Sequence, residues 1–323
     1  IILFLKFKLM RNLRLLIFVV PILLTSCYQD LDDNLPRQEK TPDPIDDNQF
    51  VTNEGEVFAT GLKCKGTGDY STGEHSILEN LAIPEDLPGE YDLSEFLPPV
   101  GDQGQLGSCS SWAVSYYLKS YQEMKESGAS YSLATTFSPS FTYNQLTMGD
   151  CGGTSIAETL DLVQEVGVCS LELFPYDDSG CSDQPNETQI AQAAAARISD
   201  FKSLSGENML AEMKVLITRQ QPIVIGAYLS SEFGKTDRFG LTAYREHVVD
   251  YENGDCHAML VVGFSDEYNA FKVVNSWGEN WGSDGFVWID YAAFENVNDE
   301  SANFRVINNA YIAYDAVAAV GPG

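Results

Sequence analysis

The stretch at residues 101–114 reads GDQGQLGSCSSWAV, and it places one thiol after a glycine-rich loop and before an aromatic run. Trp112 and Tyr116 begin a series of positions four residues apart, which predicts a helix that starts near Cys109 and ends at Gly128. A thiol in the first turn of a helix faces unpaired N–H groups and the positive end of the helix dipole, which favour the thiolate. Cys109 is therefore a candidate nucleophile, and the alternative is a buried, inert cysteine.

A nucleophilic cysteine needs a base, and the chain has three histidines. His257 begins the apolar run HAMLVVGF, directly after the turn signal ENGD at residues 252–255. An imidazole at the mouth of a buried strand suits a cleft better than a core, so His257 is the candidate base. His247 is interpreted as structural and His75 as a surface residue.

A general base also needs a partner that orients its second ring nitrogen. Asn275 stands in VVNSWG at the end of the next apolar run, 18 residues after His257, which is a spacing typical of a hairpin. Its amide oxygen can accept the imidazole N–H, and Trp277 could cover that hydrogen bond from water.

The order of the predicted elements indicates an α+β protein. Helical patterns come first, and after Pro222 the runs become apolar and β-branched between Gly, Asn and Asp clusters. A helical half before a β-rich half favours a cleft between the two. The expected helices are at 109–128, 154–167, 190–201 and 206–220, and the expected strands are at 222–229, 256–264, 270–277, 285–291 and 305–314.

Five segments together resemble the papain-like (C1-type) cysteine peptidases, over about residues 98–290. They are DQGQLGSC at 102–109, CGG at 151–153, FPY at 174–176, CHAMLVVGF at 256–264 and NSWGENWGSDGFVWI at 275–289. The resemblance implies a two-lobed fold. A helical N-terminal lobe and an antiparallel β-barrel-like C-terminal lobe would have the active-site cleft between them.

The resemblance also implies catalytic roles. Cys109 would be the nucleophile, His257 the base and acid, and Asn275 the residue that orients the imidazole. Gln103 matches the family's oxyanion-hole glutamine, which acts together with the backbone N–H of Cys109.

Three further residues are implied to bind substrate. Gly152 and Gly153 match the stretch that pairs with an extended substrate backbone, where glycine permits close approach. Trp277 is the third.

The sequence departs from the family at two places in the loop before the nucleophile. Leu106 stands where the family has a cysteine, and Ser110 stands where it has a tryptophan. The disulfide that normally ties this loop to the CGG stretch is therefore absent, and Cys151 needs another partner, for which we choose Cys181. These changes affect loop rigidity more than chemistry.

The predicted function is thiol-dependent proteolysis through a thioester acyl-enzyme, and the leading hypothesis is an endopeptidase. The alternatives are an exopeptidase or transpeptidase that uses the same site, and an inactive papain-fold surface binding protein. Asp and Glu total 47 against 19 Lys and Arg, so nucleic-acid binding is disfavoured. The scattered histidines without an H-E-x-x-H motif predict no metal site, and no cofactor is expected.

The N-terminal residues are predicted to be a targeting segment. Residues 10–27, MRNLRLLIFVVPILLTSC, combine basic residues, a short apolar run and small residues, as in a secretory signal whose true start is Met10. LTSC resembles the lipobox of bacterial lipoproteins, which implies cleavage before Cys27, lipidation of its thiol and attachment to the outer membrane, with surface exposure as one option. The predicted divisions are a signal at 1–26, an acidic tether at 27–49, a short pro-segment or spacer at 50–85, the peptidase domain at 86–315 and a tail at 316–323.

Overall fold

The computed structural model describes residues 48–52, 54–63, 78, 81–204, 208–245, 255–294 and 306–316. The chain divides into two units, Ile1–Asp43 and Pro44–Gly323, and every described residue belongs to the second. Cys27, His75 and His247 lie outside the described residues, as does the predicted signal segment. No helix among the described residues is long and apolar enough to cross a membrane.

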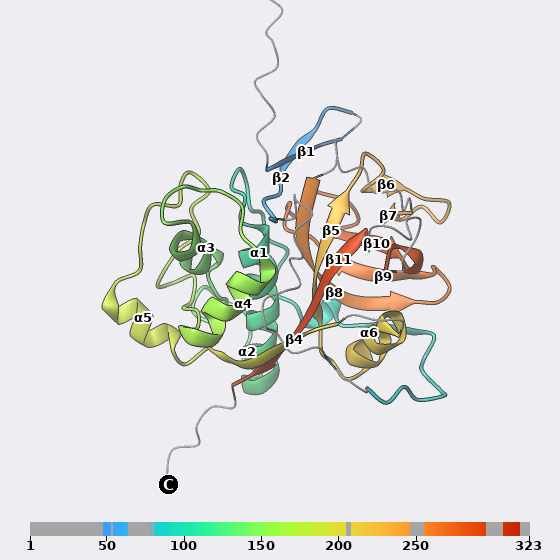
Figure 1. Ribbon diagram of the computed structural model, residues 1–323, viewed down its shortest axis with the longest axis horizontal. Helices are drawn as coiled ribbons and strands as arrows, with labels where there is room; N and C mark the ends of the chain where they lie inside the picture. Colours follow the sequence, from blue (N-terminus) through green and yellow to red (C-terminus); the bar gives the residue numbers. More distant parts are fainter. Residues whose placement is uncertain are drawn as a thin grey trace, which may run out of the picture. The chain divides into compact units, whose positions relative to one another are not determined.

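The first lobe is built on one helix that begins at Cys109. It runs as α1 (Cys109–Ser111), a π-helical segment η2 (Trp112–Lys119) and α2 (Ser120–Ser127), and it ends at Gly128 with φ +68°. The predicted start and C-cap of this helix are confirmed. The lobe also contains η1 (Ser94–Phe96), α3 (Pro139–Thr147) and α4 (Ile156–Glu165), which contact this helix, and α5 (Glu187–Ala193) at its outer edge (Figure 1).

The helix expected at 190–201 is wrong beyond Ala193. α5 ends at Ala193, and Ile198–Ser203 forms strand β4, which pairs antiparallel with β11 (Ile307–Asp315). Ile198 and Phe201 are buried in that strand. Pairing with β11 at the edge of the sheet therefore overrides the helix propensity of the alanines before Ile198.

The second lobe is a twisted, mostly antiparallel sheet. The strand order is β4-β11-β5-β8-β9-β10-β7-β6, β3 also pairs with β8, and the β10–β7 pair is parallel. No pairing among the described strands joins β4 to β6, so the sheet is open, and "barrel-like" describes it only loosely. Its strands are β3 (Glu90–Asp92), β5 (Ile223–Leu229), β6 (Lys235–Thr236), β7 (Thr242–Tyr244), β8 (Asp255–Ser265), β9 (Ala270–Val274) and β10 (Phe286–Asp290), with α6 (Met209–Thr218) and η3 (Tyr291–Phe294) beside them.

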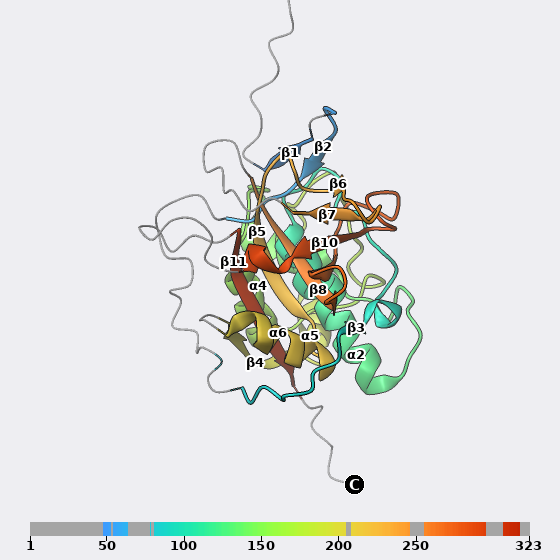
Figure 2. The ribbon, with the colours of Figure 1, turned by 90° about the vertical axis from the view of Figure 1, so that its right-hand side faces the viewer.

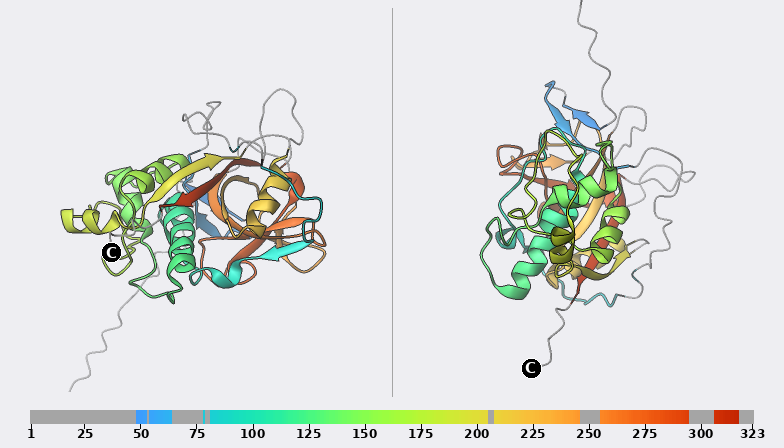
Figure 3. Two further views of the ribbon diagram at one scale, coloured as in Figure 1. Left: turned by 90° about the horizontal axis from the view of Figure 1, so that it is seen from below. Right: turned by 90° about the vertical axis from the view of Figure 1, so that its left-hand side faces the viewer.

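The two lobes share one hydrophobic core. The helix that begins at Cys109 packs against β8, every residue of which is buried. Helices α1 to α5 gather on one side of this unit, and most of the strands lie on the other, together with α6 (Figure 3). Because β8 carries His257 and the helix carries Cys109, the contact between the lobes brings the two candidate catalytic groups to one place.

A hairpin of two short strands precedes the first lobe. β1 (Gln49–Val51) and β2 (Val57–Ala59) pair antiparallel and form a sheet of their own. The hairpin lies at the same end of this unit as β6 and β7 (Figure 2).

Candidate active site

Cys109 lies at the start of the first lobe's helix and is fully buried. Its Sγ accepts a hydrogen bond from the backbone N–H of Ala258 at 3.4 Å. Ala258 directly follows His257 on β8. Burial raises the pKa of the Cys109 thiol to about 12, so the thiol is neutral in this arrangement.

His257 is tied to Asn275. The His257 Nε2 atom and Asn275 Oδ1 are 2.7 Å apart, and Oδ1 also accepts the backbone N–H of Ser276 at 2.7 Å. Because Oδ1 is an acceptor, Nε2 carries the proton and Nδ1 is left as the basic nitrogen. Nδ1 is buried and has no hydrogen-bond partner among the described residues. The Trp277 ring stacks on the imidazole with a centroid distance of 4.7 Å.

The protonation state of His257 follows from its burial. Burial lowers the pKa of the imidazole from 6.5 to about 4, although the hydrogen bond to Asn275 opposes that change. At neutral pH the site therefore contains a neutral thiol and a neutral imidazole. Water would have to reach the pair before its charged form is favoured.

Gln103 is held with its side-chain N–H groups facing backbone carbonyls. Ser276 Oγ donates to Gln103 Oε1 at 2.6 Å, and Gln103 Nε2 donates to the Leu106 carbonyl at 2.9 Å and to the Thr60 carbonyl at 3.1 Å. Tyr176 donates from its hydroxyl to the Gln103 carbonyl at 2.7 Å. The amide is thus fixed, and one of its donors is occupied by a residue from outside the lobes.

That residue belongs to what we call the covering segment, the described residues of 48–63. Trp277 is stacked by Phe58 at 4.6 Å and by Phe50 at 5.8 Å, and its Nε1 donates to the Ala59 carbonyl at 2.7 Å. The Thr60 hydroxyl donates to the Asp255 carboxylate. The hairpin therefore lies against the indole that stacks on His257, and Thr60, directly after it, contacts Asp255 and Gln103.

The covering segment continues along the stretch predicted to bind substrate backbone. Thr154 N–H donates to the Gly61 carbonyl at 2.9 Å, Lys63 N–H donates to the Thr154 carbonyl at 3.1 Å, and Leu62 and Thr154 form a parallel bridge. A Cβ atom on Gly153 would lie 2.5 Å from the Gly61 oxygen, so glycine permits this approach. Gly153 and its neighbour Thr154 thus already face an extended chain, while nothing lies within 4 Å of the Cβ position of Gly152.

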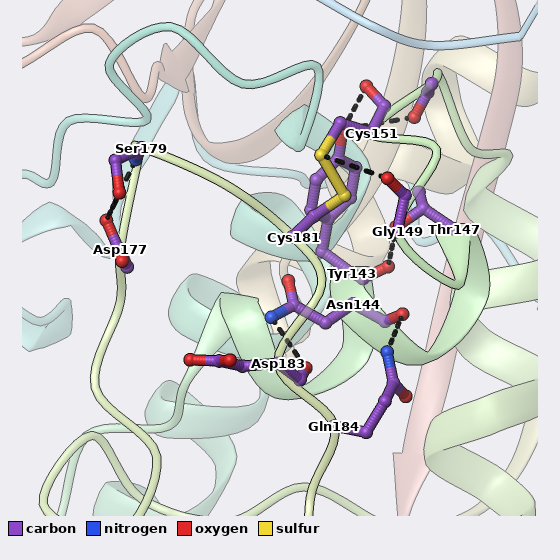
Figure 4. The surroundings of a disulfide bond; sticks show 11 residues. Tyr143, Asn144, Thr147, Gly149, Cys151, Asp177, Ser179, Cys181, Asp183 and Gln184 are labelled. Carbon is purple, nitrogen blue, oxygen red and sulfur yellow. Dashed lines mark hydrogen bonds between the residues drawn. A yellow bond between two sulfur atoms is a disulfide. The ribbon is translucent and has the colours of Figure 1, made fainter.

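The chosen disulfide is confirmed. Cys151 and Cys181 are bonded with their Cα atoms 5.5 Å apart, and the Tyr143 hydroxyl donates to the carbonyls of Cys151 at 2.7 Å and Gly152 at 3.1 Å (Figure 4). Leu106 packs in a small buried cluster with Tyr143 and Cys181. Apolar contact at Leu106 thus joins the loop to the CGG stretch in place of the missing cross-link.

The other described cysteines divide into two kinds. Cys109 and Cys169 are free and buried. Cys256 is disulfide-bonded.

Removing the Cys151–Cys181 disulfide should destabilise the helical lobe. The bond spans 30 residues, and the chain-entropy estimate for such a loop is about 3 kcal/mol. We expect Cys181→Ala to lower the free energy of unfolding in urea by about that amount. Cys169→Ala, at a buried free thiol, is the matched control, and equal losses in the two variants would contradict the prediction.

The stability of the covered protein should fall as the pH falls from about 6.5 to about 4. The pKa of His257 is lower in the folded chain than its ordinary value of 6.5, so in this window the unfolded chain binds a proton that the folded chain does not. The loss is on the order of 3 kcal/mol and is complete below the folded pKa. Urea midpoints at several pH values should show a smaller slope in this window for His257→Ala than for the unaltered protein, and parallel curves would contradict the assignment.

Comparisons with known proteins identify the family. The sequence model of the papain family cysteine proteases matches residues 87–306, so the chain belongs to that family. An uncharacterised peptidase C1-like protein of Acanthamoeba polyphaga mimivirus is 26% identical over 231 residues, which are 64% of this chain and 71% of that protein. Mouse cathepsin K is 27% identical over 237 residues, 71% of this chain and 67% of cathepsin K.

A solved structure shows the same fold. Xylellain, a cysteine protease from Xylella fastidiosa, superposes with a TM-score of 0.62 at 21% identity, covering 80% of this chain and 96% of xylellain. At that identity the match establishes the fold, which is the papain-like two-lobed fold. With the family membership, it makes the protein a cysteine-type peptidase that acts on polypeptides.

Sequence reasoning did not foresee where the covering segment lies. The sequence predicts a pro-segment or a spacer at residues 50–85 but not its position, because a short hairpin has no periodic signal like that of a long helix. The usable signal was the pair Phe50 and Phe58, two aromatic residues in an otherwise polar, glycine-containing stretch.

Proposed function

We propose that the protein is an endopeptidase that uses Cys109, His257 and Asn275. His257 Nδ1 takes the thiol proton, Cys109 Sγ attacks the peptide carbonyl, and the imidazolium then gives its proton to the departing amine. Water, deprotonated by the same nitrogen, hydrolyses the thioester and regenerates the thiol. The observation that carries the proposal is the 2.7 Å contact between His257 Nε2 and Asn275 Oδ1, which leaves Nδ1 as the basic ring nitrogen of His257.

Gln103 would stabilise the oxyanion in this reaction. Its Nε2 now donates to the carbonyl oxygen of Thr60 at 3.1 Å, the kind of group that a substrate would present. Such a donor is typically worth about 3 kcal/mol of transition-state stabilisation. Trp277 shields the His257–Asn275 hydrogen bond, and Gly152 and Gly153 would bind substrate backbone.

Endopeptidase activity is supported by the path of the covering segment. A continuous chain runs from Trp277, past Gln103, to Thr154, so a polypeptide fits along the site in both directions from the nucleophile. An exopeptidase needs one of these directions closed. The test is mass spectrometry of products from peptides with both ends blocked and from the same peptides with free ends. Internal cleavage of the blocked peptides is expected, and removal of terminal residues from free peptides only would contradict the proposal.

We also propose that the described part of 50–85 is a pro-segment that keeps the peptidase domain, 86–315, latent. It occupies the Gln103 donor, stacks two phenylalanine rings on the Trp277 indole, accepts the indole N–H, and pairs with the backbone of Thr154. A site in this state has no room for a substrate until the segment moves. The experiment is given in the Discussion.

Export and lipid attachment remain a proposal from sequence. The signal at 1–26, the acidic tether at 27–49 and lipidation at Cys27 would anchor the enzyme to a bacterial outer membrane. Incorporation of labelled palmitate that is lost in Cys27→Ala is the expected result, and an unlabelled but exported protein would contradict the anchor.

A further inference from the structure

A single buried hydroxyl connects three segments of the candidate site. Tyr117 lies eight residues after Cys109 on the same continuous helix and is 1% exposed. Its hydroxyl accepts the backbone N–H of Gly101 at 3.0 Å and donates to the Asn275 carbonyl at 2.8 Å. Gly101 begins the loop that carries Gln103, and Asn275 is the partner of the imidazole.

The two backbone groups that Tyr117 joins lie beside a short ladder. The Gly278 N–H donates to the Gly101 carbonyl at 2.9 Å, and the Gln103 N–H donates to the Ser276 carbonyl at 2.8 Å. Asp102 and Trp277 are the paired residues between these bonds. The Tyr117 hydroxyl adds one more connection between the loop at Gly101 and the strand end at Asn275. Because Tyr117 lies on the helix that begins at Cys109, it also links both segments to that helix.

We propose that Tyr117 is a positioning residue for peptide hydrolysis. Its hydroxyl sets the loop of Gln103 and the strand end at Asn275 at a fixed place relative to Cys109, and the proposal rests on the function proposed above. The side chain is suited to this task because burial raises its pKa, so it stays protonated and can donate and accept at once. The loop also has Leu106 where a cross-linking cysteine would fix it, so its position depends on non-covalent contacts.

The test compares Tyr117→Phe with Tyr121→Phe in the full chain. Tyr121 is the matched control because it is on the same helix, is 2% exposed, and donates from its hydroxyl to the Gln220 carbonyl at 3.0 Å, away from the site. For Tyr117→Phe we expect kcat to fall about tenfold or more, because misplacement of catalytic groups by ~1 Å can cost about 100-fold. KM should change less than about twofold, since no substrate contact is removed.

Two readouts separate positioning from a merely structural role. Affinity for a peptide aldehyde, whose adduct with Cys109 carries the oxyanion, should fall by the same factor as kcat. Alkylation of Cys109 by iodoacetamide, measured with the covering segment displaced, needs no oxyanion hole and should change much less. Equal kcat in the two tyrosine variants, or a raised KM with unchanged kcat, would overturn the proposal.

A second substitution covers the case in which Tyr117→Phe does not fold. Trifluorotyrosine incorporated at position 117 keeps the ring and the oxygen, but its more acidic hydroxyl is a weaker acceptor for Gly101 and a stronger donor to Asn275, so the two hydrogen bonds are no longer balanced. We expect a kcat below that of the unaltered protein at an unchanged melting temperature, and an unchanged kcat would overturn the proposal. If the unaltered protein cleaves no peptide after the covering segment is displaced, the proposed function itself fails. If it cleaves peptides and the substitutions at Tyr117 leave kcat unchanged, only the positioning role is refuted.

Discussion

Cys109→Ala is expected to reduce cleavage of an end-blocked peptide to the background rate, a loss of about 10⁴-fold or more. The variant keeps the fold, because alanine fits the space of a thiol, but it has no atom that can form the thioester. The measurement is the hydrolysis of a fluorogenic blocked peptide by each purified protein. Cys169→Ala removes the other free buried thiol and should retain full activity, because Cys169 has no part in the site.

The result also decides between an enzyme and an inactive papain-fold protein. Retained activity in Cys109→Ala would assign the chemistry to another group. A protein whose activity is absent even with the covering segment displaced, while it still binds peptides, would support the inactive alternative.

Gly61→Leu should raise kcat/KM on the order of 10- to 100-fold, as expected if the unaltered site is open only ~1–10% of the time. A Cβ atom at Gly61 would lie 2.2 Å from the Gly107 carbonyl oxygen, and the residue has φ +104°, which L side chains rarely adopt. The bulk of leucine therefore forces the segment away from the loop that carries Gln103. Initial rates of blocked-peptide hydrolysis measure the effect.

Gly55→Leu is the matched control for this substitution. Gly55 also has a positive φ, +84°, but no atom lies within 4 Å of its Cβ position, so the segment should stay in place. Proteolytic cutting at residues 84–90 is the independent test, done with a thiol reductant in every sample because Cys256 is disulfide-bonded. Equal activity before and after cutting, together with an inactive Gly61→Leu, would make the segment a spacer.

The sequence was most informative where local chemistry and topology agree. The helix at Cys109 carried a stripe and a glycine cap, and both appear in the structure. The strand at His257 and the following turn to Asn275 form the predicted antiparallel pair, β8 and β9. The Cys151–Cys181 pairing, chosen because one expected partner was missing, is also present.

The sequence was least informative where distant segments meet. Nothing local in the Ala-rich stretch before Ile198 indicates that the next residues pair with β11, more than 100 positions away. Nor does the composition around Thr60 indicate contact with Gln103, because that contact depends on the assembled lobes. The protonation states of His257 and Cys109 could not be predicted from the sequence either, because burial in the assembled fold determines their pKa values.

The most direct measurement is the alkylation rate of each cysteine by iodoacetamide, read by peptide mass spectrometry. At about pH 5.5 an ordinary thiol with a pKa of ~8.5 is only ~0.1% thiolate and hardly reacts. We predict that Cys109 is inert in the covered protein, reacts fast and alone in Gly61→Leu, and slows again when His257→Ala is added. A Cys109 that stays inert in Gly61→Leu, or that reacts equally fast without His257, would contradict a thiolate–imidazolium pair as the working form of this site.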